Sequence, residues 1–95
     1  MIIKEFELSG KPATQNIDVG GNMPVGFSAT DKNGKLTLFI QLEEDYPGKF
    51  IVDISVVKTE QRYEKMNLFA GTVVMSDGKV YHVFTNINYI RAEDL

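Results

Sequence analysis

Hydrophobic and polar residues alternate along most of the chain, and a period of two is typical of β-strands that bury one face. Short polar segments rich in Gly, Asn, Asp and Pro separate the alternating runs, as expected for turns. The pattern predicts an all-β fold, an antiparallel small barrel or sandwich of about six to seven short strands. The runs are residues 1–8, 14–19, 25–42, 50–57, 68–75 and 80–85.

The dipeptide Asn33-Gly34 divides the longest run. It is the strongest short-range signal for a two-residue type I′ hairpin, because both turn positions need a positive φ. A loop of this length pairs Lys32 with Lys35 and places apolar side chains of both strands on one face. The expected pairs further from the turn are Asp31–Leu36, Ala29–Leu38, Phe27–Ile40 and Val25–Leu42.

Asp77-Gly78 gives a second signal of the same kind, between residues 68–75 and 80–85. Treated as another two-residue hairpin, it predicts the pairs Met75–Val80, Val73–His82 and Gly71–Phe84. Both faces of this hairpin are then largely apolar. Such a hairpin is either covered on both sides or forms a contact between subunits.

The segments between the strands are predicted to be connections. Gly20-Gly21-Asn22 reads as a turn, residues 43–48 as an exposed connection, and residues 58–67 as a polar loop with room for one helical turn. The tail, residues 86–95, alternates briefly before it becomes acidic. We expect it to be an edge strand or an arm that packs on a second copy.

Composition narrows the class of protein. The hydrophobic fraction of 43% over 95 residues is enough for one core, so residues 1–95 are expected to form a single domain. A formal charge of −3 disfavours nucleic-acid binding through a basic face. No Cys is present, which excludes disulfides and zinc–cysteine sites, and the absence of a long apolar run predicts a cytoplasmic protein without a membrane span.

His82 is the only histidine, so any mechanism that needs an imidazole depends on it. The predicted hairpin places it between Val80 and Phe84, without Ser, Asp or Glu on that face. These neighbours favour a structural histidine with a bonded ring nitrogen over a catalytic one. We therefore expect no enzymatic activity, no cofactor and no metal.

Two polar and aromatic groups are the best candidates for a ligand site. Arg combined with Tyr suits an anionic planar ligand, because the guanidinium holds phosphate while the ring stacks on a base. The same residue types are enriched at protein–protein contacts, and a solvated loop or tail also contains them. The predicted ligand contacts are Lys58, Arg62, Tyr63, Tyr89 and Arg91.

The end of the chain resembles a family of small, uncharacterised phage-encoded β domains. The resemblance rests on Gly71-Thr72, the turn at Gly78 and the run His82-Val83-Phe84, with a charged first strand at residues 3–8. It implies a phage or prophage setting, and hence the host cytoplasm, without a known activity.

These observations lead to one expected function and two alternatives. The expectation is a non-enzymatic, homo-oligomeric binding protein of phage type that counteracts a host system. It would block a host protein or sequester a nucleotide-like ligand. The alternatives are a structural component of the virion or its assembly, and a small nucleic-acid-binding barrel.

Overall fold

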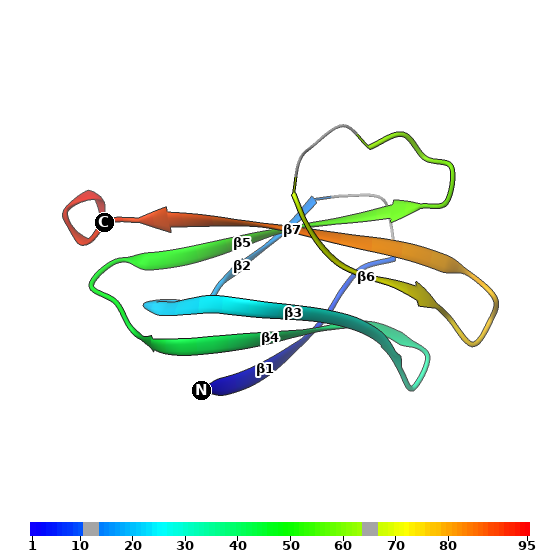
Figure 1. Ribbon diagram of the computed structural model, residues 1–95, viewed down its shortest axis with the longest axis horizontal. Coiled ribbons are helices and arrows are strands. Elements are labelled where there is room, and N and C mark those ends of the chain that lie inside the picture. Colours follow the sequence, from blue (N-terminus) through cyan, green and yellow to red (C-terminus); the bar gives the residue numbers. More distant parts are fainter. Residues whose placement is uncertain (11–13, 64–66) are drawn as a thin grey trace.

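The computed structural model describes residues 1–10, 14–63 and 67–95. Two antiparallel sheets stack as the layers of a sandwich, seen edge-on in Figure 1. This confirms the all-β prediction and selects the sandwich over the barrel. The strands that the structure describes are β1 (Ile2–Glu7), β2 (Thr14–Asp18), β3 (Asn22–Lys32), β4 (Lys35–Asp45), β5 (Lys49–Lys58), β6 (Leu68–Val74) and β7 (Val80–Ile90).

The order of the strands is β1-β4-β3 in sheet A and β2-β5-β7-β6 in sheet B. One side of the sandwich is closed where β3 and β6 approach each other, with Gly71 against the backbone of Ala29. A hydrogen bond from the Ser76 N–H to Asp31 Oδ2 (2.8 Å) joins the two layers there. The strand β1 is the edge of sheet A opposite β3, and β2 is the edge of sheet B opposite β6.

The Asn33-Gly34 hairpin has the predicted form. Asn33 and Gly34 have φ values of 54° and 81°, as a type I′ turn requires, and Lys32 pairs with Lys35. The predicted pairing holds as far as Phe27–Ile40. It fails at Val25, because the register shifts between Pro24 and Gly26 and Leu42 pairs with Pro24 instead. Val25 is consequently 45% exposed rather than part of the core.

The second hairpin lies where predicted, but its loop has three residues instead of the two expected at Asp77-Gly78. Met75 donates its N–H to the Lys79 carbonyl oxygen (2.7 Å), which leaves residues 76–78 as the loop, and Gly78 has a φ of 89°. A three-residue loop that ends on a left-handed glycine is the next common hairpin type. The extra residue changes the pairing to Val73–Tyr81 and Thr72–His82, and a second shift brings Phe69 opposite Phe84.

Other boundaries differ from the prediction in smaller ways. The strand β4 continues through Glu43 and Glu44 to Asp45, so only residues 46–48 form the connection that follows it. Residues 86–90 are the second half of β7, paired with β5 and beyond the end of β6, and not a separate strand. The described part of 58–67 contains no helix, and residues 64–66 lie outside the described residues.

The core lies between the sheets. It is built from the inward-facing positions of β4, β5 and β7, where Leu38, Ile40, Val52, Ile54 and Val83 are fully buried. The alternation in these strands explains this, since every second side chain points to the same layer. In the part of the chain that the structure describes, no helix is long and apolar enough to cross a membrane.

Thr85 brings a polar atom into this core. Its side chain is fully buried, and its Oγ1 has no hydrogen-bond partner among the described residues. We expect Thr85→Val to raise the free energy of unfolding by about 1 kcal/mol, because the substitution removes an unsatisfied hydroxyl at nearly constant volume. Urea denaturation followed by circular dichroism measures this, with Thr85→Ser as a control that keeps the hydroxyl and should lower stability. A less stable Thr85→Val variant would mean that the hydroxyl is bonded.

Candidate functional site

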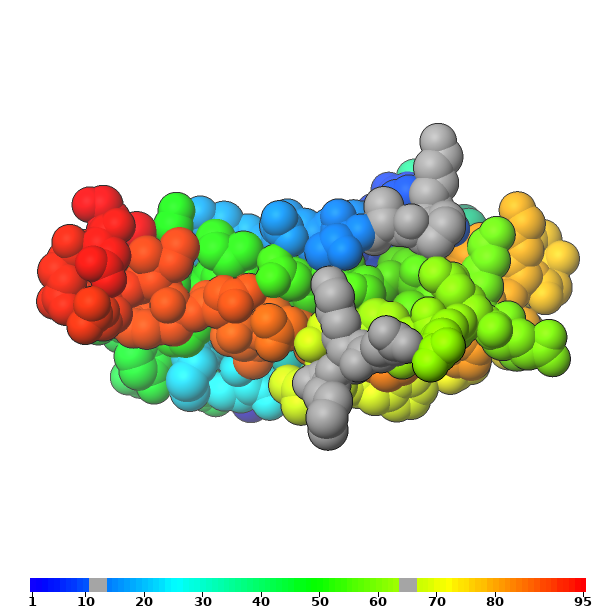
Figure 2. Space-filling view, turned by 90° about the horizontal axis from the view of Figure 1, so that it is seen from above, coloured from blue at the N-terminus to red at the C-terminus, as the bar shows by residue number. Residues whose placement is uncertain are grey.

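The outer face of sheet B contains exposed apolar side chains of β6 beside those of β7. Its pairs of neighbours across β6 and β7 are Phe69–Phe84, Thr72–His82 and Val74–Val80, and we call these six residues the β6 stripe. Phe69 is 59% and Val74 67% exposed on this face. Leu68 is 57% exposed as well, but it pairs with the buried Thr85 and so points to the other face of the sheet. Figure 2 shows this face, with β2, β5, β7 and β6 side by side.

The turn after β5 folds back over part of this face. The Tyr63 ring stacks on Phe84 with 4.4 Å between the centroids, and Phe69 packs on Phe84 from the other side at 5.3 Å. Val57 points outward beside His82, yet is only 5% exposed. The side of the stripe next to β5 is therefore covered, whereas Phe69 and Val74 on β6 are exposed to solvent.

His82 is held by two threonine hydroxyls. Its Nε2 lies 2.9 Å from Thr59 Oγ1, and its Nδ1 lies 2.8 Å from Thr72 Oγ1. Thr59 belongs to the turn and Thr72 to β6, so the ring joins both to β7. Among the described residues, neither ring nitrogen contacts a carboxylate that would orient it as a base. The structural role of His82 stays a prediction.

The other half of the same face is polar and lies beyond the end of β6. The Asp53 carboxylate accepts a hydrogen bond from Asn88 Nδ2 (2.6 Å) and, with the Asn16 amide turned to satisfy its contacts, one from Asn16 Nδ2 (2.6 Å). Asp18 lies in the next row, where the Gly20 N–H and then Lys49 lower the pKa of its carboxyl. Amide and carboxylate side chains therefore make this half of the outer face polar, whereas the apolar residues lie in the half formed by β6 and the start of β7.

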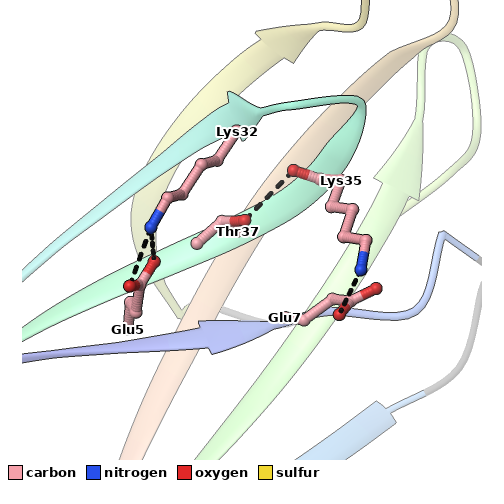
Figure 3. A network of polar contacts seen from close by, with 5 residues as sticks. All are labelled: Glu5, Glu7, Lys32, Lys35 and Thr37. Carbon is pink, nitrogen blue, oxygen red and sulfur yellow. Dashed lines mark hydrogen bonds and ion pairs between the residues drawn. The ribbon is translucent and has the colours of Figure 1, made fainter.

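The outer face of sheet A has a different character (Figure 3). Lys32 reaches across β4 to Glu5 (2.6 Å), and Lys35 reaches to Glu7 (3.6 Å), with Thr37 lying between the two pairs. Exposed pairs of this kind add little stability, about 0–1 kcal/mol each. They place paired charges at the hairpin end of this face, whereas the exposed side chains of Phe69 and Val74 on sheet B are apolar.

The predicted ligand residues do not meet in one chain. Lys58 ends β5 opposite Tyr81, and Arg62 and Tyr63 follow in the turn, whereas Tyr89 and Arg91 lie at the other end of the sandwich, where Lys49 pairs with Ile90. Lys58 is about 26 Å from Tyr89, since Tyr81 and Tyr89 are eight residues apart on β7. Tyr63 stacks on Phe84, which is five residues or about 17 Å from Tyr89. Figure 2 shows residues 58–63 and the C-terminal residues at opposite ends.

The second group is also engaged in contacts of its own. Tyr89 packs on Phe50 (4.7 Å between centroids) and its hydroxyl accepts the Gly48 N–H (3.2 Å). Arg91 binds Asp94 (3.1 Å) and Glu93 (3.2 Å) in the single 3₁₀ turn Ala92–Asp94. Among the described residues, no group of three His, Asp or Glu side chains could hold a metal ion.

The sequence pattern singled out Tyr63 and His82 but did not predict their contacts. Tyr63 stacks on Phe84, and His82 contacts two threonine hydroxyls. The two-residue register placed His82 beside Val73, and so hid its contact with Thr72. It also placed Phe84 opposite Gly71 and not beside Phe69. The exposed position of Phe69, next to residues that the turn covers, had no local signal in the sequence.

The fold defines a small β-sandwich domain, and the stripe adds exposed apolar side chains to the outer face of sheet B. A family model described as a domain of unknown function (DUF7352) matches residues 2–92, and the chain belongs to this family. No curated protein and no solved structure matches the chain.

Proposed function

We propose that the chain is a non-enzymatic binding domain that works as a homo-oligomer, with the β6 stripe as the contact between copies. The observation that carries the proposal is the exposure of Phe69 and Val74, at 59% and 67%, on the outer face of one seven-residue strand. Apolar side chains grouped in this way lose contact with water when a second surface covers them, at roughly 25 cal/mol per Å². A second copy presents the same surface to the first, as a two-fold contact requires.

The chemistry of the site favours binding over catalysis. Both ring nitrogens of His82 contact threonine hydroxyls, and neither contacts a carboxylate of the described residues. Stacked rings around Phe84 beside an open edge are typical of protein contacts, where Tyr and Phe are enriched. The likeness of residues 69–84 to phage-encoded domains supports a host protein in the cytoplasm as the target of the oligomer.

A nucleotide-like ligand is a weaker candidate. Within one chain, Lys58 is about 26 Å from Tyr89 along β7, and Tyr63 stacks on Phe84, about 17 Å from Tyr89. Phe84 and Tyr89 also point to opposite faces of the sheet, because side chains alternate along β7. A site that used all five residues would have to combine the two ends of different copies.

Sedimentation equilibrium of the wild-type chain and of the Phe69→Lys/Val74→Lys double variant tests the subunit contact. The wild type should sediment as a multiple of the chain mass, and the variant as a single chain, because two buried and unpaired ammonium groups oppose the contact. Val25→Lys is the matched control, since Val25 is also exposed but lies on β3. A wild type that stays a single chain at high micromolar concentration would overturn the proposal.

A further inference from the structure

The strand β1 presents a free edge on the side of the sandwich away from the β6 stripe. In the described part of sheet A, β1 has β4 as its only neighbour, and it lies along the lower margin of the molecule in Figure 1. An edge strand offers unpaired backbone N–H and C=O groups to another extended segment.

The register shows which backbone groups point outward. The Leu8 N–H donates to the Leu36 carbonyl oxygen (2.8 Å), in the same register that pairs Ile2 with Leu42. In an antiparallel ladder the directly bonded pairs alternate along the strand. The even-numbered residues of β1 therefore bond to β4, and the N–H and C=O groups of Ile3, Glu5 and Glu7 face the free edge.

The start of this edge is apolar. Met1, Ile2 and Ile3 are 74%, 54% and 60% exposed. Farther along, Glu5 and Glu7 are charged and are paired with lysines of the first hairpin. Charges on an edge strand discourage unspecific strand pairing. An added segment is therefore expected to pair with the apolar first residues of β1.

A hollow of about 380 Å³ opens beside the same residues. Its apolar wall is formed by Met1, Ile2 and Leu42, and its rim by the last three residues of β4, Glu43–Asp45, together with Asn22. These three carboxylates have no cationic partner among the described residues, whereas Glu5, Glu7, Asp18 and Asp77 each have one. The hollow thus joins an apolar wall to uncompensated negative charge.

We propose that the edge of β1 binds an extended peptide segment. In this segment an arginine or lysine is adjacent to the residues that pair with the start of β1. The segment continues sheet A by hydrogen bonds to Ile3 and Glu5. The aliphatic stem of its basic side chain packs on Met1, Ile2 and Leu42, and the charged group reaches the carboxylates of Glu43–Asp45. This edge is separate from the β6 stripe, so the proposal does not depend on the oligomer.

A synthetic peptide tests the proposal on the full chain. The probe is an end-blocked, fluorescein-labelled hexapeptide in which arginine alternates with valine, and its binding is followed by fluorescence anisotropy at low salt. Glu43→Gln/Glu44→Gln/Asp45→Asn should weaken binding about tenfold, since each exposed charge pair contributes a small share. Asp77→Asn/Glu93→Gln/Asp94→Asn is the matched control, because it removes three carboxylates that do not line this hollow and should leave affinity unchanged.

A second pair of measurements tests the backbone contact. Peptide with N-methylated valines should not bind, and unmodified peptide should slow amide hydrogen exchange at Ile3 and Glu5. Equal affinity for the two triple variants, or binding of the N-methylated peptide, would overturn the proposal. Protection of Ile3 and Glu5 without peptide would also overturn it, because the edge would then pair with a second copy.

Discussion

Gly48→Ala is expected to lower the free energy of unfolding by about 3 kcal/mol, because the new methyl group has no space. A Cβ at this position would overlap the carbonyl oxygen of Ile90 and lie 2.7 Å from the Tyr89 hydroxyl. The Ile90 carbonyl belongs to the backbone of β7, which cannot move away without breaking its pairing with β5. The Gly48 N–H also donates to the Tyr89 hydroxyl, so a shift of either residue loses that bond.

Chemical denaturation of Gly48→Ala and Gly34→Ala measures the effect against a matched control. At Gly34 a Cβ meets no atom within 4 Å, and the penalty comes only from its φ of 81°. We expect a loss of about 1 kcal/mol there, the usual penalty for a left-handed alanine. If Gly48→Ala proved as stable as the wild type, the close approach of residues 46–48 to the end of β7 would be wrong.

Leu38→Ala should have the largest effect of any core truncation, a loss of about 3–4 kcal/mol. Leu38 is fully buried in the first half of β4, with Phe6 of β1 and Ala29 of β3 opposite it on either side. Both neighbours are held by backbone pairing, so they cannot collapse into the space that the side chain leaves. The cavity therefore adds to the lost transfer free energy.

Val25→Ala is the control for this truncation. The sequence pattern predicted that Val25 lies in the same apolar row as Leu38, but it is 45% exposed. We expect a change within about 0.5 kcal/mol, as for most surface substitutions. Similar losses in the two variants, measured by thermal unfolding, would contradict the register shift in β3.

The two hairpins show what the sequence could predict about the fold. Asn33-Gly34 determines its loop, because two consecutive residues with positive φ fit a two-residue turn. Asp77-Gly78 is compatible with two loop lengths, since a glycine with positive φ also ends a three-residue loop. The side-chain pattern could not distinguish the two lengths, because both faces of β6 and β7 are apolar.

The register shift in β3 had a signal in the sequence, which the alternation of apolar and polar residues concealed. Pro24 has no N–H to donate, and Gly26 has no side chain to pack, and both residue types are common at bulges. They flank Val25, where the register shifts. Alternation alone placed Val25 in the core, while the backbone chemistry of its neighbours turns it outward.

The candidate site depended on contacts that sequence does not show. Tyr63 and Phe84 are far apart in the chain and meet because the turn after β5 folds back over sheet B. Conversely, Tyr63 and Tyr89 share a residue type that suggested one ligand, but Tyr63 stacks on Phe84, five residues from Tyr89, and side chains 84 and 89 point to opposite faces of β7. Residue type indicated the kind of contact, and the position of each residue on the sheet decided which contacts are possible.

Intermolecular cross-linking from position 69 tests the central claim most directly. A photoreactive phenylalanine analogue replaces Phe69 in the purified chain, and the cross-linked peptides are identified by mass spectrometry after mixing isotopically light and heavy copies. The account predicts products between the two isotopic forms, with the attachment points on β6 and β7 of the second copy. The same analogue at Val25 is the control. If both positions gave only products within a single copy at the same concentration, a subunit contact at the β6 stripe would be contradicted.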